Sequence, residues 1–418
     1  MKPVTYLILG GGSRGTTYAE YAREHPEKAK VVGVAEPRDF FRRRLAERHA
    51  IPGRQQFTTW EDALAVPRFA DAAIVATQDN LHAEPAIAAV RAGYHLLLEK
   101  PMAPTEEECR RIIDAVKKSG VLFGVCHVLR YTDLTRNLRE QILSGRIGDI
   151  ISLQHLEPVG YWHQAHSFVR GNWRNEKEST FMLLAKSCHD LDWIRFIVGE
   201  PCRSVASFGA LSHFTRQAKP PNAGTRCLQD CPAEVEARCP YSARKIYLQR
   251  AARGETGWPH DILTSSVTVE SIADALRNSP YGRCVYECDN DVVDHQVVIL
   301  NFCGGQTAAF TMTAFTEIGH RRTQIFGTRG EMWSDGETIS RFDFLSDTWS
   351  KTPVSSGHAT LLGGHGGGDY RLMEHFTAAV ADGDQKQILS GPEESLESHL
   401  MVFAVEKARR QNKVIDLL

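Results

Sequence analysis

The 418-residue sequence lacks a long hydrophobic run and an excess of charge of one sign. No apolar stretch approaches the roughly 20 residues that a membrane-spanning helix needs, so we predict no membrane span. The 49 basic and 51 acidic residues give a formal net charge of −2, which argues against binding to nucleic acid. The strand pattern at 4–9 leaves no room for a signal peptide. We therefore expect a cytoplasmic protein.

Cytoplasmic cysteines are more often thiols or metal ligands than disulfides, and this sequence has ten of them. Half lie in or just after residues 213–283, which look like an insertion. Three are spaced C-x3-C-x7-C, and a fourth follows at a distance, so together they could form a tetrahedral structural zinc site: Cys227, Cys231, Cys239 and Cys284. The spacing matches no standard zinc motif, and small buried cysteines are common. The sequence leaves metal and no metal open.

The chain is too long for one ordinary hydrophobic core, which predicts two domains. An apolar fraction of 42% and a charged fraction of 24% are typical of a globular protein. From the order of the predicted strands and helices we place a nucleotide-binding domain at 1–125 and a second domain at 126–418. The insertion about 213–283 belongs to the second.

A glycine-rich loop, residues 10–15, follows the first strand directly and precedes a helical pattern. It has the form G-x-G-x-x-G: Gly10 permits a tight turn, Gly12 lets backbone approach a pyrophosphate, and Gly15 allows close helix–strand packing. The second strand ends in Glu36, where an acid would bind the ribose hydroxyls. This carboxylate would repel a 2′-phosphate and favours NAD over NADP, although Arg38 could accept that phosphate.

Alternating strands and helices continue to residue 125, which predicts a doubly wound parallel sheet. Ligands of such sheets bind beyond the carboxyl ends of the strands, and the segments 77–80 and 99–101 lie at that edge. We therefore predict a set of cofactor-binding residues in the glycine loop, after the second strand and at these strand ends: Gly10, Gly12, Ser13, Arg14, Gly15, Glu36, Arg38, Thr77, Asn80, His82, Glu99 and Lys100.

With the glycine loop, the Ala76-Thr77 strand end, His82 and the E-K-P tripeptide at 99–101, the sequence resembles the Gfo/Idh/MocA family of glucose–fructose oxidoreductase, inositol dehydrogenase and their relatives. The resemblance implies an α/β fold: an N-terminal Rossmann domain and a C-terminal α/β domain with a large, mostly antiparallel sheet. It further implies homodimers or homotetramers, and hydride transfer between NAD(P) and a carbinol carbon of a carbohydrate-like substrate. Lys100 would be the active-site lysine.

The segment 183–194 holds the other candidate catalytic residues. His189 matches the catalytic histidine of the family, and histidine titrates near the pH at which an alcohol must lose its proton. The family commonly has an aspartate where this chain has Ala185, and Lys186 adds a cation. We therefore expect Lys186 and His189, three residues apart, to act side by side with Lys100.

Candidate substrate-binding residues lie mainly in the segment 161–174, where aromatic, histidine and arginine side chains suit sugar rings and hydroxyls. A glycine-rich run at 363–368 before a predicted helix adds two more. The predicted set comprises Tyr131, Trp162, His163, His166, Arg170, Trp173, Arg174, Asp190, His365 and Asp369. Strands expected at 150–156, 291–302, 307–314 and 322–326 would form the second sheet, with a turn at Gly304-Gly305.

Three functions fit these residues. The first is an NAD-dependent sugar or polyol dehydrogenase. The second is an NAD-dependent glycoside hydrolase of the same family, which oxidises a hydroxyl transiently, eliminates the aglycone, adds water and returns the hydride. The third is a non-catalytic NAD-binding sensor, against which the presence of Lys100 and His189 argues.

Overall fold

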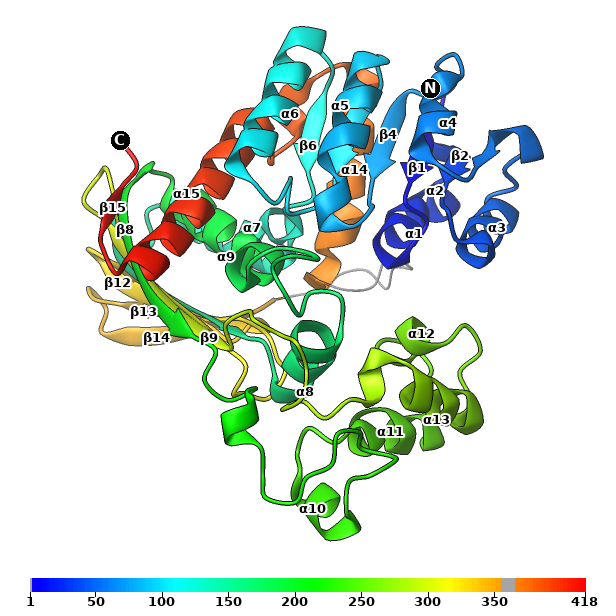
Figure 1. Ribbon diagram of the computed structural model, residues 1–418. Helices are drawn as coiled ribbons and strands as arrows, with labels where there is room; N and C mark the ends of the chain where they lie inside the picture. Colours follow the sequence, from blue (N-terminus) through cyan, green and yellow to red (C-terminus); the bar gives the residue numbers. More distant parts are fainter. Residues whose placement is uncertain (1, 355–364) are drawn as a thin grey trace.

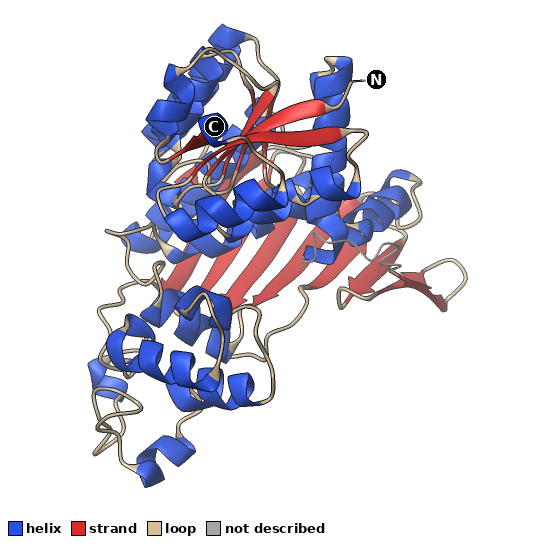
Figure 2. Ribbon diagram, turned by 90° about the vertical axis from the view of Figure 1, so that its right-hand side faces the viewer, coloured by secondary structure: helices blue, strands red, loops and turns tan. Residues whose placement is uncertain are grey.

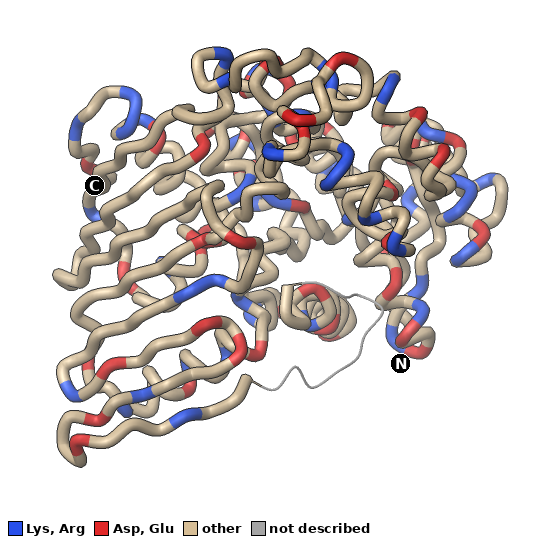
Figure 3. Tube along the Cα trace, turned by 90° about the horizontal axis from the view of Figure 1, so that it is seen from below, with Lys and Arg blue, Asp and Glu red and all other residues tan. Residues whose placement is uncertain are grey.

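The computed structural model describes residues 2–354 and 365–418. Gly363 and Gly364 of the expected glycine-rich run lie outside these residues. Two sheets organise the chain (Figure 1). No helix among the described residues combines the length and the apolar character needed to cross a bilayer. Basic and acidic residues are interspersed along the trace (Figure 3).

Sheet A is parallel and has the strand order β3-β2-β1-β4-β5-β6. Its strands are β1 (Val4–Leu9), β2 (Ala29–Ala35), β3 (Gln56–Phe57), β4 (Ala72–Val75), β5 (His95–Leu98) and β6 (Phe123–Val125). The order reverses between β1 and β4, so the crevice for a ligand opens at the carboxyl end of β1, where the glycine loop begins. This confirms the predicted Rossmann-type domain.

Helices cover both faces of sheet A. They are α1 (Ser13–Ala19), α2 (Tyr21–Glu24), α3 (Asp39–Arg48), α4 (Trp60–Ala65), α5 (Ala83–Arg91) and α6 (Glu106–Ser119). A much later helix, α14 (Gly368–Asp382), joins the face of α1 to α3 and packs Leu372 and Phe376 against Tyr6 and its neighbours. A cut at residue 125 would therefore remove a helix that covers sheet A.

Sheet B has nine strands in the order β14-β13-β12-β11-β7-β10-β9-β8-β15. Only the β7–β10 pair is parallel, which confirms the mostly antiparallel sheet. The strands are β7 (Ile150–Pro158), β8 (Cys202–Ala210), β9 (His295–Phe302), β10 (Thr307–Thr313), β11 (Arg322–Gly327), β12 (Gly330–Ser334), β13 (Thr338–Asp343), β14 (Thr348–Pro353) and β15 (Ile415–Asp416).

The strand β9 begins four residues later than predicted because the side chain of Asp294 binds the neighbouring loop. Its buried carboxylate accepts hydrogen bonds from the amides of Ser212 and His213, at 2.9 and 2.7 Å. The expected turn between β9 and β10 is present, with Gly305 at a φ of +89° that favours glycine.

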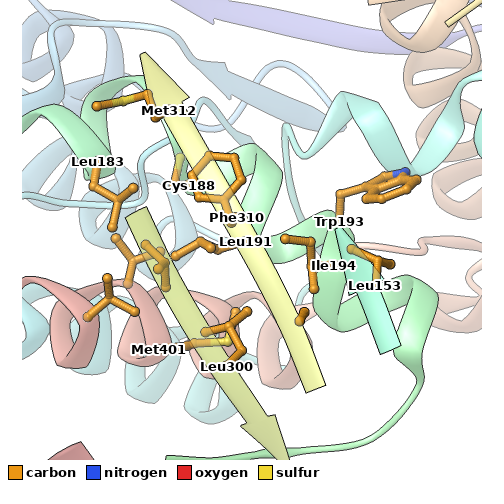
Figure 4. Packing of buried hydrophobic residues seen from close by; sticks show 14 of the residues in the cluster. Leu153, Leu183, Cys188, Leu191, Trp193, Ile194, Leu300, Phe310, Met312 and Met401 are labelled. Atoms are coloured by element: carbon orange, nitrogen blue, oxygen red, sulfur yellow. The ribbon is translucent and has the colours of Figure 1, made fainter. Parts of the chain in front are cut away.

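Helices α7 (Asp133–Leu143), α9 (Met182–Val198) and α15 (Pro392–Gln411) lie on the inner side of sheet B. Side chains of α9 such as Leu191 and Ile194 pack with Phe310 of β10 (Figure 4). This packing fixes α9 and, with it, the position of His189. The outer side of the sheet leaves apolar side chains exposed at alternate positions: Ile151, Phe208, Val297, Ile299, Trp333 and Trp349.

The predicted insertion forms a lobe of loops and short helices between β8 and β9, below the sheet in Figures 1 and 2. Its helices are α10 (Ala233–Arg238), α11 (Gln249–Ala252), α12 (His260–Leu263) and α13 (Val269–Asn278). The lobe has its own apolar core, to which Ala165 and Val169 contribute. These two residues belong to a π-helical segment, Gln164–Arg170, that follows α8 (Tyr161–His163) and anchors the lobe to the sheet.

Candidate active site

The glycine loop leaves β1 with the geometry that a pyrophosphate site requires. A side chain at Gly10 would lie 2.4 Å from the carbonyl oxygen of Ala76, and one at Gly15 would lie 2.0 Å from the carbonyl oxygen of Gly10. At Gly12 a side chain would meet only the Arg38 guanidinium, at 3.2 Å, so this part of the backbone is open to a ligand. The residues present therefore fit a dinucleotide, with Ser13 and Arg14 at the start of α1.

Glu36 is held against the glycine loop at the end of β2. Its carboxylate is buried and accepts the Gly11 amide at 2.9 Å and the Arg38 guanidinium at 2.7 Å. Arg38 stacks over the ring of Phe41 and its side chain is 57% exposed. The two residues from which the sequence predicted the cofactor preference thus lie side by side.

The strand ends after β4 and β5 are joined by His82. One ring nitrogen lies 2.7 Å from the carbonyl oxygen of Pro101, and the other lies 3.2 Å from that of Thr77. His82 is buried and positions both strand ends, whereas Asn80 beside it is exposed. The side chain of Lys100 reaches across to α9, where Nζ donates to the carbonyl oxygen of Ala185 at 2.8 Å.

Arg14 connects the glycine loop to the rest of the site. Its guanidinium pairs with Glu99 at 2.6 Å and with the fully buried Asp369. Burial opposes ionisation of Glu99, but Arg14 and Lys100 outweigh it and hold the pKa of this carboxyl below its usual value. The contact between Arg14 and Asp369 spans 355 residues of sequence and brings the start of α14 to the glycine loop.

Asp369 also bonds His365, and the two form an Asp–His dyad. Nδ1 of His365 lies 2.9 Å from Oδ2 of Asp369. Burial opposes ionisation of Asp369, yet Arg14 and His365 lower its pKa to about 2. The carboxylate thus holds the proton on Nδ1 of His365 and leaves Nε2 as the reactive nitrogen. The His365 side chain is 34% exposed, so it is accessible to a substrate.

His189 lies beside this dyad on α9. Its ring centre is 5.8 Å from that of His365 and 6.1 Å from that of His127. Burial, followed by the charge of Lys100, lowers the pKa of His189 well below its usual value. Its Nδ1 atom is buried and has no hydrogen-bond partner within residues 2–354 and 365–418. Burial and the Lys100 charge thus both favour the neutral form of the His189 imidazole.

Lys186, expected beside His189, is paired with an acid of sheet B. Its Nζ lies 2.9 Å from the buried carboxylate of Glu157 on β7, which also pairs with Arg321 at 2.9 Å. Because Glu157 neutralises it, Lys186 turns toward sheet B, and Lys100 is the cation that influences His189. Asp190 is fully buried, and its carboxylate is bonded to Arg321 and His155.

Four other predicted substrate-binding residues are occupied by structural contacts. The Tyr131 hydroxyl binds Ser390 at 3.0 Å. His166 lies 2.9 Å from the Tyr247 hydroxyl inside the lobe, and the Arg170 guanidinium donates to lobe carbonyl groups. The guanidinium of Arg174 is paired with Glu178 and Asp289. All four side chains, like that of Asp190, are thus held by contacts within the protein.

Two aromatic residues and one histidine of the segment 161–174 contact the end of β4 or the lobe. Nε1 of Trp173 donates to Asp79 at 2.9 Å and so joins the second domain to the end of β4. His163 and Trp162 pack against Trp258 of the lobe. Burial, then the charge of Lys186, lowers the pKa of His163 below its usual value.

Sequence reasoning missed several residues that shape the site. Glu157, Arg321 and His127 stand in ordinary strand or loop patterns with no motif of their own. Asp79 lies in the segment 77–80, at the end of a predicted strand. That position was the signal from which a contact between the domains could have been predicted.

The four cysteines of the predicted zinc site line one small cavity in the lobe. Within residues 2–354 and 365–418, no three His, Cys, Asp or Glu side chains are arranged to hold a metal ion. All ten cysteines are free thiols.

The parts of the chain that form the two sheets both match known families. Residues 4–127 match the description "Oxidoreductase family, NAD-binding Rossmann fold", and residues 139–417 match "Oxidoreductase family, C-terminal alpha/beta domain". The chain belongs to the Gfo/Idh/MocA oxidoreductase family. It is therefore an NAD(P)-dependent oxidoreductase, as the glycine loop predicted.

Individual relatives of this Gfo/Idh/MocA protein are distant. The Bacillus subtilis protein YteT is 26% identical over 340 residues, which cover 77% of this chain and 76% of YteT. The 2,7-anhydro-N-acetylneuraminate hydratase of Escherichia coli is 29% identical, over 50% of this chain and 54% of the enzyme. A solved levoglucosan dehydrogenase in complex with NADH and levoglucosan is 20% identical, with a TM-score of 0.71 over 99% of both chains, and so shares the fold.

Proposed function

We propose that this protein oxidises or reduces a carbinol carbon of a sugar, a sugar derivative or a polyol, with Lys100 and His189 as its catalytic residues. One observation carries the proposal: Lys100, His189 and the His365–Asp369 dyad meet beside the glycine loop. Three groups able to hold or move a proton thus surround the place where a nicotinamide would lie.

Bound NAD would supply the hydride acceptor, held by the glycine loop, Glu36 and the two strand ends. Nζ of Lys100 orients the substrate hydroxyl by a charge-assisted hydrogen bond. The neutral imidazole of His189 takes the hydroxyl proton as the carbinol carbon becomes a carbonyl, and it returns that proton in the reverse direction. Trp162, His163 and Trp173 offer rings and a hydrogen-bonding group to the sugar.

Glu36 sets the preference for NAD over NADP in this proposal. Glu36→Gln should lower the ratio of kcat/KM for NAD to that for NADP by about tenfold, or roughly 1.4 kcal/mol, because the repulsion of a 2′-phosphate is lost. Steady-state kinetics with both cofactors measures the ratio. The matched variant Arg38→Gln should raise it. An unchanged ratio in Glu36→Gln would assign the selectivity to Arg38.

A redox-assisted elimination or hydration is the second candidate function. In such a cycle oxidation acidifies the neighbouring C–H bond, a second base removes that proton, and the hydride is later returned. The Asp369-supported His365 provides the second base beside His189. The hydratase among the relatives also favours this reaction class, and an NAD-dependent glycoside hydrolase would use the same steps.

A single assay separates the two functions. The purified protein is incubated with NAD and a panel of free sugars, anhydrosugars and aryl glycosides, followed by absorbance of NADH and by mass spectrometry. NADH that accumulates with a free sugar supports the dehydrogenase. Product formation that requires catalytic NAD, without accumulation of NADH, supports the elimination. No conversion of any sugar or glycoside would contradict both.

We further infer a cytoplasmic homodimer or homotetramer. An NAD-dependent enzyme needs the cofactor pool of the cell, and its cysteines are free thiols. The exposed apolar side chains on the outer side of sheet B, among them Phe208, Ile299 and Trp349, form a surface that a second copy would cover.

A further inference from the structure

A second buried histidine lies beside the candidate base. His127 follows β6 by two residues and is fully buried, and its ring centre lies 6.1 Å from that of His189. Neither ring nitrogen of His127 has a hydrogen-bond partner in the described part of the chain, and Nδ1 of His189 has none there either. Buried polar atoms in native proteins are nearly always paired, because an unpaired one costs free energy. Two adjacent rings with unpaired nitrogens can satisfy each other.

Asp192 determines which nitrogen of His127 carries the proton. This carboxylate lies one turn after His189 on α9, and its Oδ1 is 3.6 Å from Nε2 of His127. The Arg130 guanidinium donates to both carboxylate oxygens, at 2.6 and 2.8 Å, and the Ser398 hydroxyl donates at 2.7 Å, which stabilises the ionised form. A carboxylate that faces Nε2 favours a proton there and leaves a lone pair on Nδ1 of His127.

His127 is available as a hydrogen-bond acceptor. Burial lowers its pKa to about 3 and so favours the neutral ring, which has one donor and one acceptor. The ring centre of His399 lies 5.4 Å away, but both nitrogens of His399 are occupied. Its Nε2 accepts the Met102 amide at 2.9 Å, and its Nδ1 lies 2.8 Å from the Ser395 carbonyl oxygen. His399 therefore has no nitrogen left for His127, whereas His189 has one.

The other acceptors beside His189 are occupied or open to water. The carbonyl oxygen one turn earlier on α9, that of Ala185, accepts Nζ of Lys100 at 2.8 Å. His365 has its ring centre 5.8 Å from that of His189, but its side chain is 34% exposed, so water can reach its free nitrogen. Nδ1 of His189 is buried, like both nitrogens of His127. His127 is therefore the acceptor that best completes the surroundings of His189.

We propose that His127 is the positioning residue of the base, and that its Nδ1 accepts the Nδ1–H of His189. This bond fixes the tautomer in which Nε2 of His189 carries the lone pair, and Nε2 then takes the proton of the substrate hydroxyl. The two rings form no hydrogen bond in the structure, and catalytic hydrogen bonds are often long until substrate binds. The effect of the tautomer on turnover rests on the proposed function, whereas the bond itself does not.

Asp192 completes a line of three groups in this proposal. When His189 takes the substrate proton on Nε2, it becomes an imidazolium that still donates from Nδ1 to His127. The proton on Nε2 of His127 stays in place and faces Asp192, so the carboxylate stabilises the new positive charge through the intervening ring. In the reverse direction His189 returns the proton to the substrate, and His127 neither gains nor loses one.

Nitrogen NMR of the full chain tests the tautomer directly. The protein is labelled with ¹⁵N-histidine, NAD is added, and the resonances of His189 are assigned from their loss in His189→Asn. The nitrogen shifts and their two-bond couplings to the ring protons distinguish Nδ1–H from Nε2–H. His189 should be mostly the Nδ1–H tautomer, and His127 the Nε2–H tautomer. A His189 ring with its proton on Nε2 would overturn the proposal.

Two substitutions at position 127 separate the acceptor from the bulk of the ring. His127→Leu removes the acceptor, so His189 should become a mixture of tautomers, and kcat should fall roughly 10–100-fold with KM nearly unchanged. His127→Asn keeps an acceptor near the place of Nδ1, so it should retain the Nδ1–H tautomer of His189 and most of the turnover. Where His127→Leu fails to fold, the wild-type spectrum and His127→Asn still decide.

Two neighbouring histidines serve as matched controls. His399→Asn removes a ring whose nitrogens bind backbone groups, and His365→Asn removes the partly exposed neighbour of His189. Both should leave the tautomer of His189 unchanged. A mixture in His365→Asn, with an unchanged tautomer in folded His127→Leu, would overturn the proposal in favour of His365. If no sugar is turned over while the His189 tautomer responds to His127→Leu, the proposed reaction fails and the pairing stands.

Discussion

His189→Asn should lower kcat by roughly 10²–10⁴-fold while the Kd for NAD changes little, because removal of a general base costs about this much. Burial and the charge of Lys100 keep the His189 imidazole neutral, which is the state that accepts a proton. Asparagine fills a similar volume but cannot accept a proton at neutral pH. Steady-state turnover with the substrate found in the sugar panel, and calorimetric titration with NAD, measure the two quantities.

A second histidine serves as the matched control. His95 begins β5 at the edge of sheet A opposite to Lys100, and its Nδ1 accepts the Leu122 amide at 3.0 Å. His95→Asn keeps an acceptor there and should retain wild-type turnover. Full turnover in His189→Asn would refute the assigned base. In that case the His365–Asp369 dyad, at 5.8 Å between ring centres, becomes the candidate.

Local patterns in the sequence were sufficient to predict the nucleotide half of the site. A strand, a glycine loop and a helix follow one another within about fifteen residues. Each glycine lies where a side chain would clash with the backbone or block the approach of a ligand. Glu36 and Lys100 follow strands of the same sheet, so their position at one edge was also predictable. The comparisons confirmed the fold and the cofactor on these grounds.

The substrate half depended on contacts that no local pattern contains. Arg14 meets Asp369 across 355 residues, and Trp173 meets Asp79 across 94. The expected cooperation of Lys186 with His189 used helical spacing alone. In the structure Lys186 pairs with Glu157, on a strand of sheet B, which helical spacing does not reveal. Aromatic and basic composition likewise could not tell a cleft residue from one that anchors the lobe, such as Arg170.

Lys100→Met should lower kcat by roughly 10²–10³-fold and also move the pH dependence of the remaining activity. The Lys100 charge is the largest electrostatic cause, after burial, of the lowered pKa of His189. Without it the pKa of His189 rises toward 6.5. Since His189 works as a base only when neutral, the loss of oxidative activity in acid should then begin at a higher pH than in the wild type.

The sign of this shift separates an electrostatic effect from a steric one. Lys100→Arg keeps the charge, so its acid limb should stay where the wild type has it, even if the planar guanidinium fits the Ala185 carbonyl poorly and kcat falls. Lys118→Met removes an exposed lysine of α6 and should change neither quantity. NMR of the His189 imidazole measures the shift of its pKa directly, and the pH profile of kcat/KM measures the shift of the acid limb. If Lys100→Met instead lowers the rate and leaves the His189 titration unmoved, Lys100 contacts the substrate without changing the pKa of His189. The two residues would then act independently.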